Sequence, residues 1–595
     1  MTATDHKQRL DALRRQLADL NCDGFVLPRT DRFGSEYLPA ADERVAWLTG
    51  FTGSAARVVV LAGDAALFTD GRYTLQAESE VDGNLFERLH ITDKPPAEWL
   101  GSKLSKDHRL GYDPYLHLKS DVERLQKLAK DAGAELVALD RNPIDSLWTD
   151  RPPSPSAPIT VHDVDYAGET SASKRSRMLA KVHDKHADGL LLTASDSIAW
   201  LLNIRGNDIP FNPLCLALCV LEPDGGALLL LEPAKVPDGF PFEPQIRTHP
   251  IDDRASLLKS FAARQERLLV DPKQTHLGWL LELEQAGVPL VEGDEPVYPA
   301  KAIKNQVEID GSIRAHIRDG AAVSRFLAWL DGQDRTNELE AARQLQAERQ
   351  KDPTYRGDSF DTISGVGAHG ALIHYRVTDK SNCELEPGSL YLVDSGGQYP
   401  DATTDITRTV AVGEPDAEMR RRFTLVLKGH IALATTVFPK GTSGSQLDAI
   451  ARMPLWVAGF DFDHGTGHGI GSYLCVHEGP QRISKRGGDS ALEPGMILSN
   501  EPGYYKAGAY GIRIENLVLV EERAAPPDGE RDLLGFKTLS LAPIDRRLID
   551  VTMLDEDERD WVDAYHGAVF RKLADHMNDA ETAWLEAATA PLAVD

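Results

Sequence analysis

The stretch LEPGSLYLVD (385–394) recurs in altered form as LEPGMILSNE (492–501), and this repeat decides how we interpret the fold. In each copy Pro-Gly indicates a turn, and the apolar run after it is typical of a buried strand. Each copy ends in an acid, Asp394 or Glu501, six residues after its glycine. The repeat therefore predicts two similar buried strands, each with a carboxylate at its end.

A second β-rich run follows each copy and carries a second acid. TDITRTV (404–410) contains Asp405, and IRIENLV (512–518) contains Glu515. The segments between the runs are rich in Gly together with Pro or Tyr, which is typical of hairpins. We therefore expect each hairpin to bring two carboxylates together at the end of a buried strand pair.

Carboxylates away from water are costly unless they meet a cation. Only Arg408 and Arg513 lie near these four acids in the sequence, so two cations face four anions and a metal is the better account. The segment HGTGHG (464–469) adds His468, and four carboxylates with one imidazole suit two hard or borderline divalent ions. The alternative is two ordinary hairpins with solvated acids, which we would prefer for any one of these acids alone.

Four phrases carry a resemblance to the pita-bread metallopeptidases, the family of methionine aminopeptidase, prolidase and aminopeptidase P. They are VDSGGQYPDATTDITRTV (393–410), HGTGHGIGSYLCVHEGP (464–480), NEPGYYKAGAYGIRIEN (500–516) and GALIHY (370–375). The chain is most similar to the long, three-domain cytosolic aminopeptidases P, over nearly its whole length and most densely from 300 to 560. The fold class implied is α/β (α+β), with two related creatinase-N-like α/β domains before a C-terminal pita-bread catalytic domain.

The resemblance implies a role for each candidate site residue. The implied ligands of two divalent cations are Asp394, Asp405, His468, Glu501 and Glu515. Asp405 and Glu515 would bridge both ions, and Glu501 would also accept the proton of the attacking water. Mn²⁺ is the expected ion because the site is rich in oxygen, with Zn²⁺ or Co²⁺ as alternatives.

Further residues of the matching phrases have implied roles around the substrate. His374 and His477 would serve the oxyanion and the leaving nitrogen, and His464 would line the cleft. Arg513 and Tyr505 would orient ligands and substrate. Phe360 would wall an apolar proline pocket or belong to the core.

The implied activity is release of the N-terminal residue from peptides with proline in second position, by attack of a hydroxide shared between the two ions. Two alternatives remain: a prolidase-like dipeptidase, and a catalytically inactive binding module on the same fold. The complete ligand set argues against the inactive module, and the length of the chain argues against a prolidase, which usually has one domain before the catalytic one.

The composition excludes some classes of protein. Lys and Arg total 65 against 92 acidic residues, so the net charge is −27, which argues against nucleic-acid and anionic-membrane partners. Five cysteines without a Cys-x-x-Cys spacing make a disulfide framework unexpected and favour a reducing compartment. No apolar signal core or membrane span is evident, so we expect a cytoplasmic enzyme.

The N-terminal half contains a repeat. Trp47 precedes Gly53 by six residues in the first copy, and Trp200 precedes Gly206 by six in the second. With linkers at 152–158 and 296–304, the expected domains are 1–155, 160–300 and 305–595. The first two domains carry no visible chemistry, and we expect them to wall the cleft so that only a short, free N-terminus reaches the ions.

Helical patterns frame the catalytic region. Residues 308–330 and 338–349 have helical apolar spacing, and residues 552–555 resemble a capping box that opens a C-terminal helix. The apolar face of that last helix would be core or a dimer contact, with core preferred. We expect a homodimer formed through the C-terminal domain.

Overall fold

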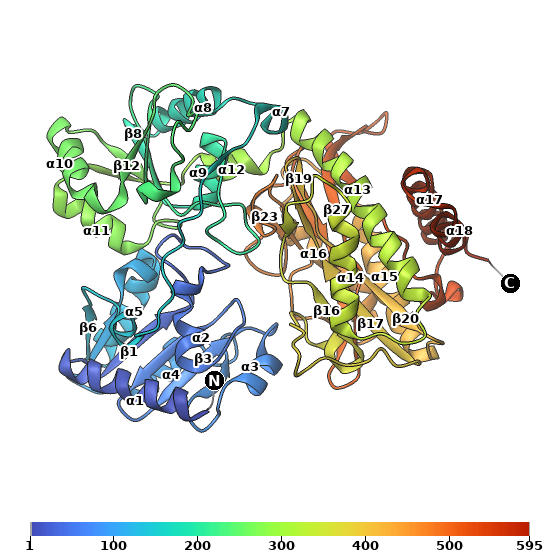
Figure 1. Cartoon of the computed structure of the whole chain (residues 1–595), viewed down its shortest axis with the longest axis horizontal. Helices are drawn as coiled ribbons and strands as arrows, with labels where there is room; N and C mark the ends of the chain where they lie inside the picture. The colour runs from blue at the N-terminus through green and yellow to red at the C-terminus, as the bar shows by residue number, and fades with distance from the viewer. Residues whose placement is uncertain (1–2, 594–595) are drawn as a thin grey trace. The chain divides into compact units, whose positions relative to one another are not determined.

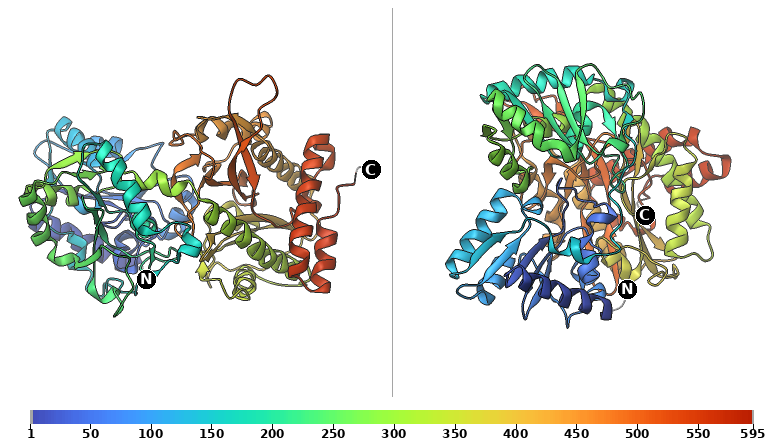
Figure 2. Two further views of the ribbon diagram at one scale, coloured as in Figure 1. Left: turned by 90° about the horizontal axis from the view of Figure 1, so that it is seen from above. Right: turned by 60° about the vertical axis from the view of Figure 1, so that its left-hand side comes forward.

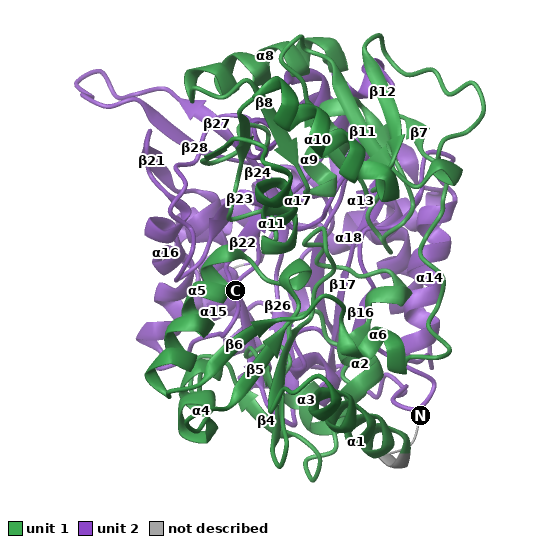
Figure 3. Cartoon of the chain, turned by 90° about the vertical axis from the view of Figure 1, so that its left-hand side faces the viewer, with its two compact units in different colours: residues 1–162, 169–297 green, residues 163–168, 298–595 purple. Residues whose placement is uncertain are grey.

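The computed structural model describes residues 3–593, which divide into two compact units (Figure 3). Unit 1 consists of Met1–His162 and Glu169–Val297, and unit 2 consists of Asp163–Gly168 and Tyr298–Asp595. The finer division of the N-terminal half into two domains, with the boundaries expected from the sequence, stays a prediction.

Unit 1 contains two six-stranded sheets with the same topology (Figure 1). The first has the order β4-β3-β2-β1-β5-β6 and consists of β1 Gly24–Pro28, β2 Arg57–Leu61, β3 Ala65–Thr69, β4 Glu87–His90, β5 Arg109–Tyr112 and β6 Glu135–Ala138. The second has the order β12-β11-β10-β8-β13-β14 and consists of β8 Gly189–Leu192, β10 Leu218–Leu221, β11 Ala227–Leu231, β12 Ile246–Pro250, β13 Leu268–Val270 and β14 Leu290–Glu292.

The two sheets also match in strand direction. In each, the three consecutive strands that begin with β1 or β8 pair antiparallel, and the outer strands pair parallel. Trp47 lies in α2 (Arg44–Thr49) and Trp200 in α9 (Ser195–Leu202), the helices between the first two strands of each sheet. The repeat of two related α/β folds predicted from the sequence is confirmed.

Helices cover both sheets, because their apolar faces need partners in the core. They are α1 Ala3–Asp19, α3 Thr74–Glu80, α4 Pro96–Lys103, α5 Lys119–Asp131, α6 Pro143–Leu147, α8 Ser171–Asp184, α10 Arg254–Arg264 and α11 Leu277–Ala286. The two halves of unit 1 touch through α11: the Trp279 Nε1–H donates to the Arg32 carbonyl at 2.7 Å, and the Leu277 N–H donates to the His117 carbonyl at 2.8 Å.

Two of the sheets in unit 2 each share a core with a pair of helices. The antiparallel sheet β16-β17-β20 (Ile363–Val366, Ser389–Ser395, Ile406–Val412) shares a core with α13 (Gln306–Asp331) and α14 (Glu338–Gln350). The second sheet has the order β21-β28-β27-β24-β22-β23 and shares a core with α15 (Ala417–Ala434) and α16 (Gly444–Val457). Its strands are β21 Val437–Pro439, β22 Gly467–Gly469, β23 Glu478–Ile483, β24 Ile497–Asn500, β27 Asn516–Arg523 and β28 Leu533–Thr538.

The first predicted hairpin is present as β17 and β20, with the short strands β18 (Gly397–Tyr399) and β19 (Ala402–Thr403) between them. β18 also pairs with β15 (Gly357–Asp358). The pairing runs from Ser389 opposite Val412 to Ser395 opposite Ile406, so the two acids of this hairpin lie at one end.

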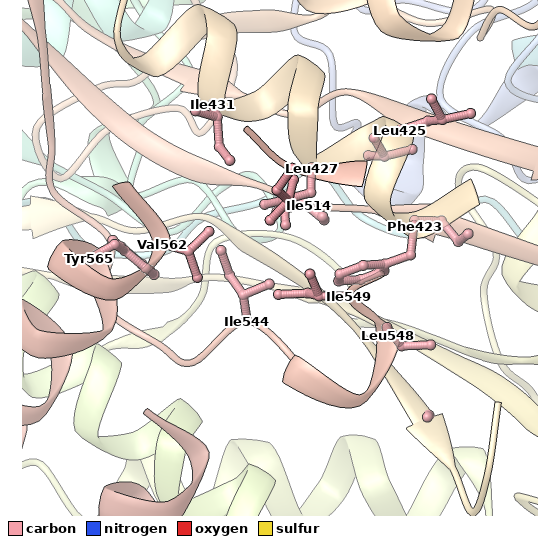
Figure 4. Close-up of a cluster of buried hydrophobic side chains, with 14 of the residues drawn as sticks. Phe423, Leu425, Leu427, Ile431, Ile514, Ile544, Leu548, Ile549, Val562 and Tyr565 are labelled. Atoms are coloured by element: carbon pink, nitrogen blue, oxygen red, sulfur yellow. The ribbon is translucent and has the colours of Figure 1, made fainter. Parts of the chain in front are cut away.

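The second hairpin differs from its prediction, because the expected strand over 512–518 is broken. β26 (Tyr510–Arg513) pairs with β25 (Gly503–Lys506) in a separate ribbon, and β27 pairs with β24. The break falls at Ile514 and Glu515, where the Glu515 N–H donates to the Thr407 carbonyl at 3.2 Å. Ile514 is 1% exposed and points among apolar side chains of α15 and of the segments near 544–565 (Figure 4), so it anchors the neighbouring acid.

The predicted linker 296–304 contains the boundary between the two units, at Val297 and Tyr298, and it forms α12 (Val297–Ala302), in which Lys301 is 1% exposed. One local prediction was wrong. The capping box of the C-terminal helix uses Asp555 and Glu558, three residues beyond the predicted position, and opens α17 (Glu556–Leu573).

The apolar face of α17 lies in the core, as the sequence favoured. Val562, Val569 and Leu573 are fully buried, and both α17 and α18 (Asp579–Ala588) contact α13 (Figure 2). The apolar residues after 552 therefore no longer support a dimer contact, because their side chains already pack within the chain. All five cysteines are free, and no described helix is long and apolar enough to cross a membrane.

Candidate metal centre

The five predicted ligands lie in or directly beside five different strands. Asp394 lies in β17 and His468 in β22, Asp405 directly precedes β20, Glu501 directly follows β24, and Glu515 directly precedes β27. Asp405, His468 and Glu515 each offer a ligand atom, and these atoms lie within 4.8 Å of one another. His468 Nε2 is 3.5 Å from Asp405 Oδ2 and 3.5 Å from Glu501 Oε1.

Arg513 contacts an acid of this group directly. Arg513 Nη2 donates to Asp394 Oδ2 at 2.7 Å. Arg408, the other candidate cation, donates instead to the backbone carbonyls of Thr407 at 2.9 Å and Glu515 at 2.7 Å. These bonds of its guanidinium go to the backbone rather than to the carboxylates. The sequence argument that acids outnumber cations here therefore becomes stronger in the structure.

The surplus of negative charge is visible in the pKa values. Burial, followed by the neighbouring carboxylates of Glu515, Asp394 and Glu501, raises the pKa of Asp405 well above its usual range. Burial and the Asp394 and Glu501 carboxylates do the same to the pKa of Glu515. Burial raises the pKa of Glu501 to about 7. Such carboxylates become stable as anions only beside added positive charge.

Two carboxylate oxygens of the centre have no hydrogen-bond donor among the described residues. They are Asp394 Oδ1 and Asp405 Oδ1, and both are buried. Buried acceptors without a donor carry a desolvation penalty that a directly bound cation removes. The acceptor-rich donor set, its excess charge and these two bare oxygens therefore fit a site for divalent cations.

Two hydroxyls that the sequence reading missed hold the ligands in place. Thr407 Oγ1 donates to Glu515 Oε2 at 2.6 Å, and Ser499 Oγ donates to Glu501 Oε1 at 3.0 Å. Thr407 stands two residues after Asp405, and Ser499 stands two residues before Glu501. Because side chains alternate along a strand, a polar residue at this spacing shares the face of the acid, which is the signal that could have found both.

The histidines surround this group on two sides. The rings of His468 and His477 meet edge to face with centroids 4.4 Å apart. On the other side, Tyr505 Oη lies 2.8 Å from His464 Nε2 and accepts from Arg513 Nη1 at 2.7 Å. A chain of contacts thus links Asp394 through Arg513 and Tyr505 to His464.

The remaining predicted residues lie on the segments beside β16 and β17. The carbonyl of Ile373, the residue before His374, accepts from Arg513 Nη1 at 3.4 Å. Phe360 is 8% exposed and follows Ser359, whose N–H donates to the Gly396 carbonyl at 3.0 Å. Low exposure fits the core interpretation of Phe360; its place in a proline pocket stays a prediction.

A buried charge cluster next to His477 was not anticipated. Lys301 Nζ and Lys304 Nζ lie 3.0 Å and 2.5 Å from the two oxygens of Glu478, and all three side chains are at most 1% exposed. A Cβ on Gly479 would meet Tyr298 Oη at 1.9 Å, so the segment around α12 presses directly on the chain after His477. The available signal was a pair of lysines, Lys301 and Lys304, three residues apart in a presumed linker.

Comparison with known proteins identifies the parts of the chain. Residues 311–522 match the model of "Metallopeptidase family M24", and 532–592 match the "C-terminal region of peptidase_M24". Residues 9–147 and 150–308 each match a "Creatinase/Prolidase N-terminal domain". The chain is 38% identical over 616 residues to the "Probable Xaa-Pro aminopeptidase P" of Paracoccidioides brasiliensis, covering 100% of both. The chain belongs to metallopeptidase family M24.

Within M24, the full-length likeness is to aminopeptidases P. The "Probable Xaa-Pro aminopeptidase P" of Neurospora crassa is 39% identical over 98% of this chain and 89% of its own length. The structure described as "X-prolyl aminopeptidase from Caenorhabditis elegans: a cytosolic enzyme with a di-nuclear active site" is similar with a TM-score of 0.92, at 35% identity, over 98% of this chain and 99% of its own. This M24 protein is a hydrolase with creatinase-type domains before a pita-bread domain, as the resemblance implied.

Other M24 structures resemble part of the chain. An Xaa-Pro dipeptidase from Bacillus anthracis covers 63% of this chain with a TM-score of 0.51 and 24% identity, while the match includes 99% of its own chain. That likeness concerns the fold alone.

Proposed function

We propose that this M24 hydrolase releases the N-terminal residue from peptides whose second residue is proline, with two divalent cations, Mn²⁺ first among them. The observation that carries the proposal is the group of three buried carboxylates, the partly buried Glu501 and one imidazole, which among the described residues has a single direct guanidinium contact. The names of the full-length relatives support the substrate class.

The proposed ligands divide between two ions. Asp405 and Glu515 would bridge them, Asp394 would complete one, and His468 with Glu501 would complete the other. When bound, the cations would acidify a water molecule and polarise the scissile carbonyl. Carboxylate-rich sites suit Mn²⁺, and Zn²⁺ or Co²⁺ could use the same residues.

The chain's own residues would then manage protons and orientation. Glu501 would accept the proton of the attacking water at its carboxylate. His374 and His477 would donate to the developing oxyanion and to the leaving proline nitrogen, and His464 would line the substrate cleft. The contacts of Arg513 with Asp394 at 2.7 Å and with Tyr505 at 2.7 Å support orienting roles for both.

Selection for proline rests on the chemistry of its nitrogen. The bond before proline is a tertiary amide without N–H, so recognition has to come from the shape of an apolar pocket rather than from that donor. Phe360 is our candidate for its wall. A short, free N-terminus is the expected substrate, with the domains of unit 1 acting as the limit on length.

The decisive assay uses the tripeptide Arg-Pro-Pro with Mn²⁺. We expect release of Arg alone, no cleavage of the N-acetylated tripeptide, and much slower cleavage of Arg-Ala-Pro. A prolidase-like enzyme would cleave Arg-Pro and leave the tripeptide intact, and this outcome would replace the proposal. If the acetylated peptide were cleaved as fast as the free one, the enzyme would not require a free N-terminus, and this part of the proposal would be wrong.

We further propose a cytoplasmic homodimer without nucleic-acid or membrane partners. Large apolar side chains are exposed at the end of α16, where Met453, Trp456 and Val457 are 56%, 45% and 85% exposed. We propose these side chains, in place of the residues after 552, as the surface that binds a second copy of the chain. Sedimentation should give a dimer at micromolar concentration and a monomer for Trp456→Glu; a monomeric parent protein would remove this proposal.

A further inference from the structure

A second group of metal-ligating side chains lies outside the ligand set of the main centre. It consists of Glu338, His369 and Cys383, which each offer one ligand atom within 4.8 Å of the others. Glu338 is the first residue of α14, His369 lies in the 3-10 turn Gly367–Ala371, and Cys383 lies in the loop before β17. The group therefore joins three segments that are separate in the sequence.

Glu338 holds these segments together from a fully buried position. Its Oε1 accepts from the Val366 N–H at 2.8 Å and lies 2.8 Å from His369 Nδ1. Its Oε2 accepts from the Tyr375 hydroxyl and the Cys383 N–H, both at 3.1 Å. The imidazole and the thiol-bearing residue are thus fixed beside a carboxylate before any ligand arrives, which lowers the cost of organising a site.

Cys383 is the exposed member of the five cysteines; Cys22, Cys215 and Cys219 are buried, and Cys475 is half-buried. Burial and the Glu338 carboxylate raise the pKa of its thiol. A coordinating cation reverses this preference, because a metal binds the thiolate and displaces its proton. The His369 side chain is 25% exposed, so solvent can reach the group from that side as well.

We propose that Glu338, His369 and Cys383 form a second cation site, which binds a thiophilic divalent ion of the Zn²⁺ class. On binding, the thiol proton leaves to solvent and the neutral His369 ring coordinates through Nδ1 with its single N–H on Nε2, while the carboxylate keeps its other three donors. Water completes the coordination because Cys383 is exposed. The thiolate separates this site chemically from the oxygen-rich main centre.

The same group touches the segment that carries His374. The rings of His369 and Tyr375 stack with centroids 4.4 Å apart and an interplanar angle of 25°, and Tyr375 directly follows His374. A cation at this site would tie residues 367–383 to α14. We therefore expect filling of the site to slow amide hydrogen exchange in this segment.

Titration of Cd²⁺ into protein saturated with Mn²⁺ tests the site without any assay of peptide cleavage. Thiolate bound to Cd²⁺ gives an ultraviolet charge-transfer absorption, whereas the carboxylate and imidazole residues of the main centre give none. We expect a saturable absorption at one equivalent, its loss in Cys383→Ser, and its retention in Cys475→Ser as the matched cysteine control. His369→Ala should weaken binding by about 10-fold or more.

Three outcomes would overturn the site: no absorption in the parent protein, its survival in Cys383→Ser, or an unchanged affinity in His369→Ala, which would mean binding by an isolated thiol. Circular dichroism confirms that each variant is folded before its result is used. Since the readout follows the thiolate, failure of the proposed peptidase activity would leave the result unaffected.

Discussion

Two buried carboxylate groups of unit 2 are treated in opposite ways. Glu478 lies between Lys301 and Lys304 at 3.0 Å and 2.5 Å, so one acid has two cations. The candidate metal centre has four acids and, within residues 3–593, one direct guanidinium contact, from Arg513 to Asp394 at 2.7 Å. Two lysines neutralise Glu478, whereas the acids of the candidate metal centre leave negative charge that a bound ion can neutralise.

Removing a bridging acid is the strongest test of this contrast. Asp405→Ala or Glu515→Ala should abolish peptide cleavage and lower the metal content, because each side chain would contact both ions. Glu414→Ala, which removes an acid with a 92% exposed side chain, is the control and should leave both unchanged. Full activity of a chelated, metal-free sample would show that the surplus charge serves another purpose.

The second test separates the ligands from the histidine beside them. His477→Ala should keep both ions and the fold and should lower kcat by about 100-fold or more, as expected for loss of an acid–base or oxyanion group. Elemental analysis with steady-state kinetics measures both quantities. A fall in metal content instead would reassign His477, whose ring lies 4.4 Å from that of His468, as a ligand.

The third test concerns the lysine pair. Lys304→Met leaves Glu478 with Lys301 alone, and we expect the chain around His477 to shift and kcat to fall by about 10-fold with KM and metal content nearly unchanged. Lys304→Arg, which keeps the charge, should recover most of the rate. If Lys304→Met is poorly folded, Lys304→Gln, which keeps a hydrogen-bond donor for Glu478, takes its place.

Equal losses in Lys304→Met and Lys304→Arg, or a change in KM alone, would mean that the pair stabilises the fold without positioning His477. The loss of kcat in His477→Ala sets the scale for this test. A substitution of Lys304, which would only position His477, should lower kcat by less than removal of the His477 ring.

Much of the fold could be predicted from the sequence because it depends on local patterns of residues. The repeat in unit 1 shows as matching Trp-to-Gly spacings, and the long helices α13 and α14 show as apolar periodicity. The break at Ile514 and Glu515 was not predicted, since the run IRIENLV (512–518) contains neither Gly nor Pro. The bond from the Glu515 N–H to the Thr407 carbonyl, across 108 positions, and the separate pairings of β26 and β27 reveal the change of partner.

The candidate site was accessible to a similar degree. Two of its acids end a repeated phrase and the other two stand in the β-rich runs that follow, so their convergence could be predicted from strand ends. The Glu478 cluster could not be, because Lys301 and Lys304 occur in a Pro-containing segment that reads as a linker and their partner lies far along the chain. Burial of charge depends on tertiary contacts, and composition alone gives no sign of it.

The smallest expected effect is a pH dependence of stability that arises from the four acids of the candidate metal centre. The pKa of Glu501 is about 7 in the folded protein without metal, above the value of about 4.3 expected for an unfolded chain. The folded state therefore binds this proton more tightly than the unfolded state, so stability present below about pH 4 is lost as the pH rises through about 7. The pKa values of Asp405 and Glu515 are raised as well.

Thermal melting of chelated protein should give a Tm that falls from pH 5 to pH 7. The fall should be shallower in Glu501→Gln and the same as in the parent protein in the exposed control Glu414→Gln. With Mn²⁺ present the gain in Tm from the ion should grow over the same interval, because protons and cations compete for the same oxygens. A chelated protein whose Tm rises with pH, or a Glu501→Gln slope equal to that of the parent, would mean that the acids are already compensated within the chain and that the contrast with Glu478 is wrong.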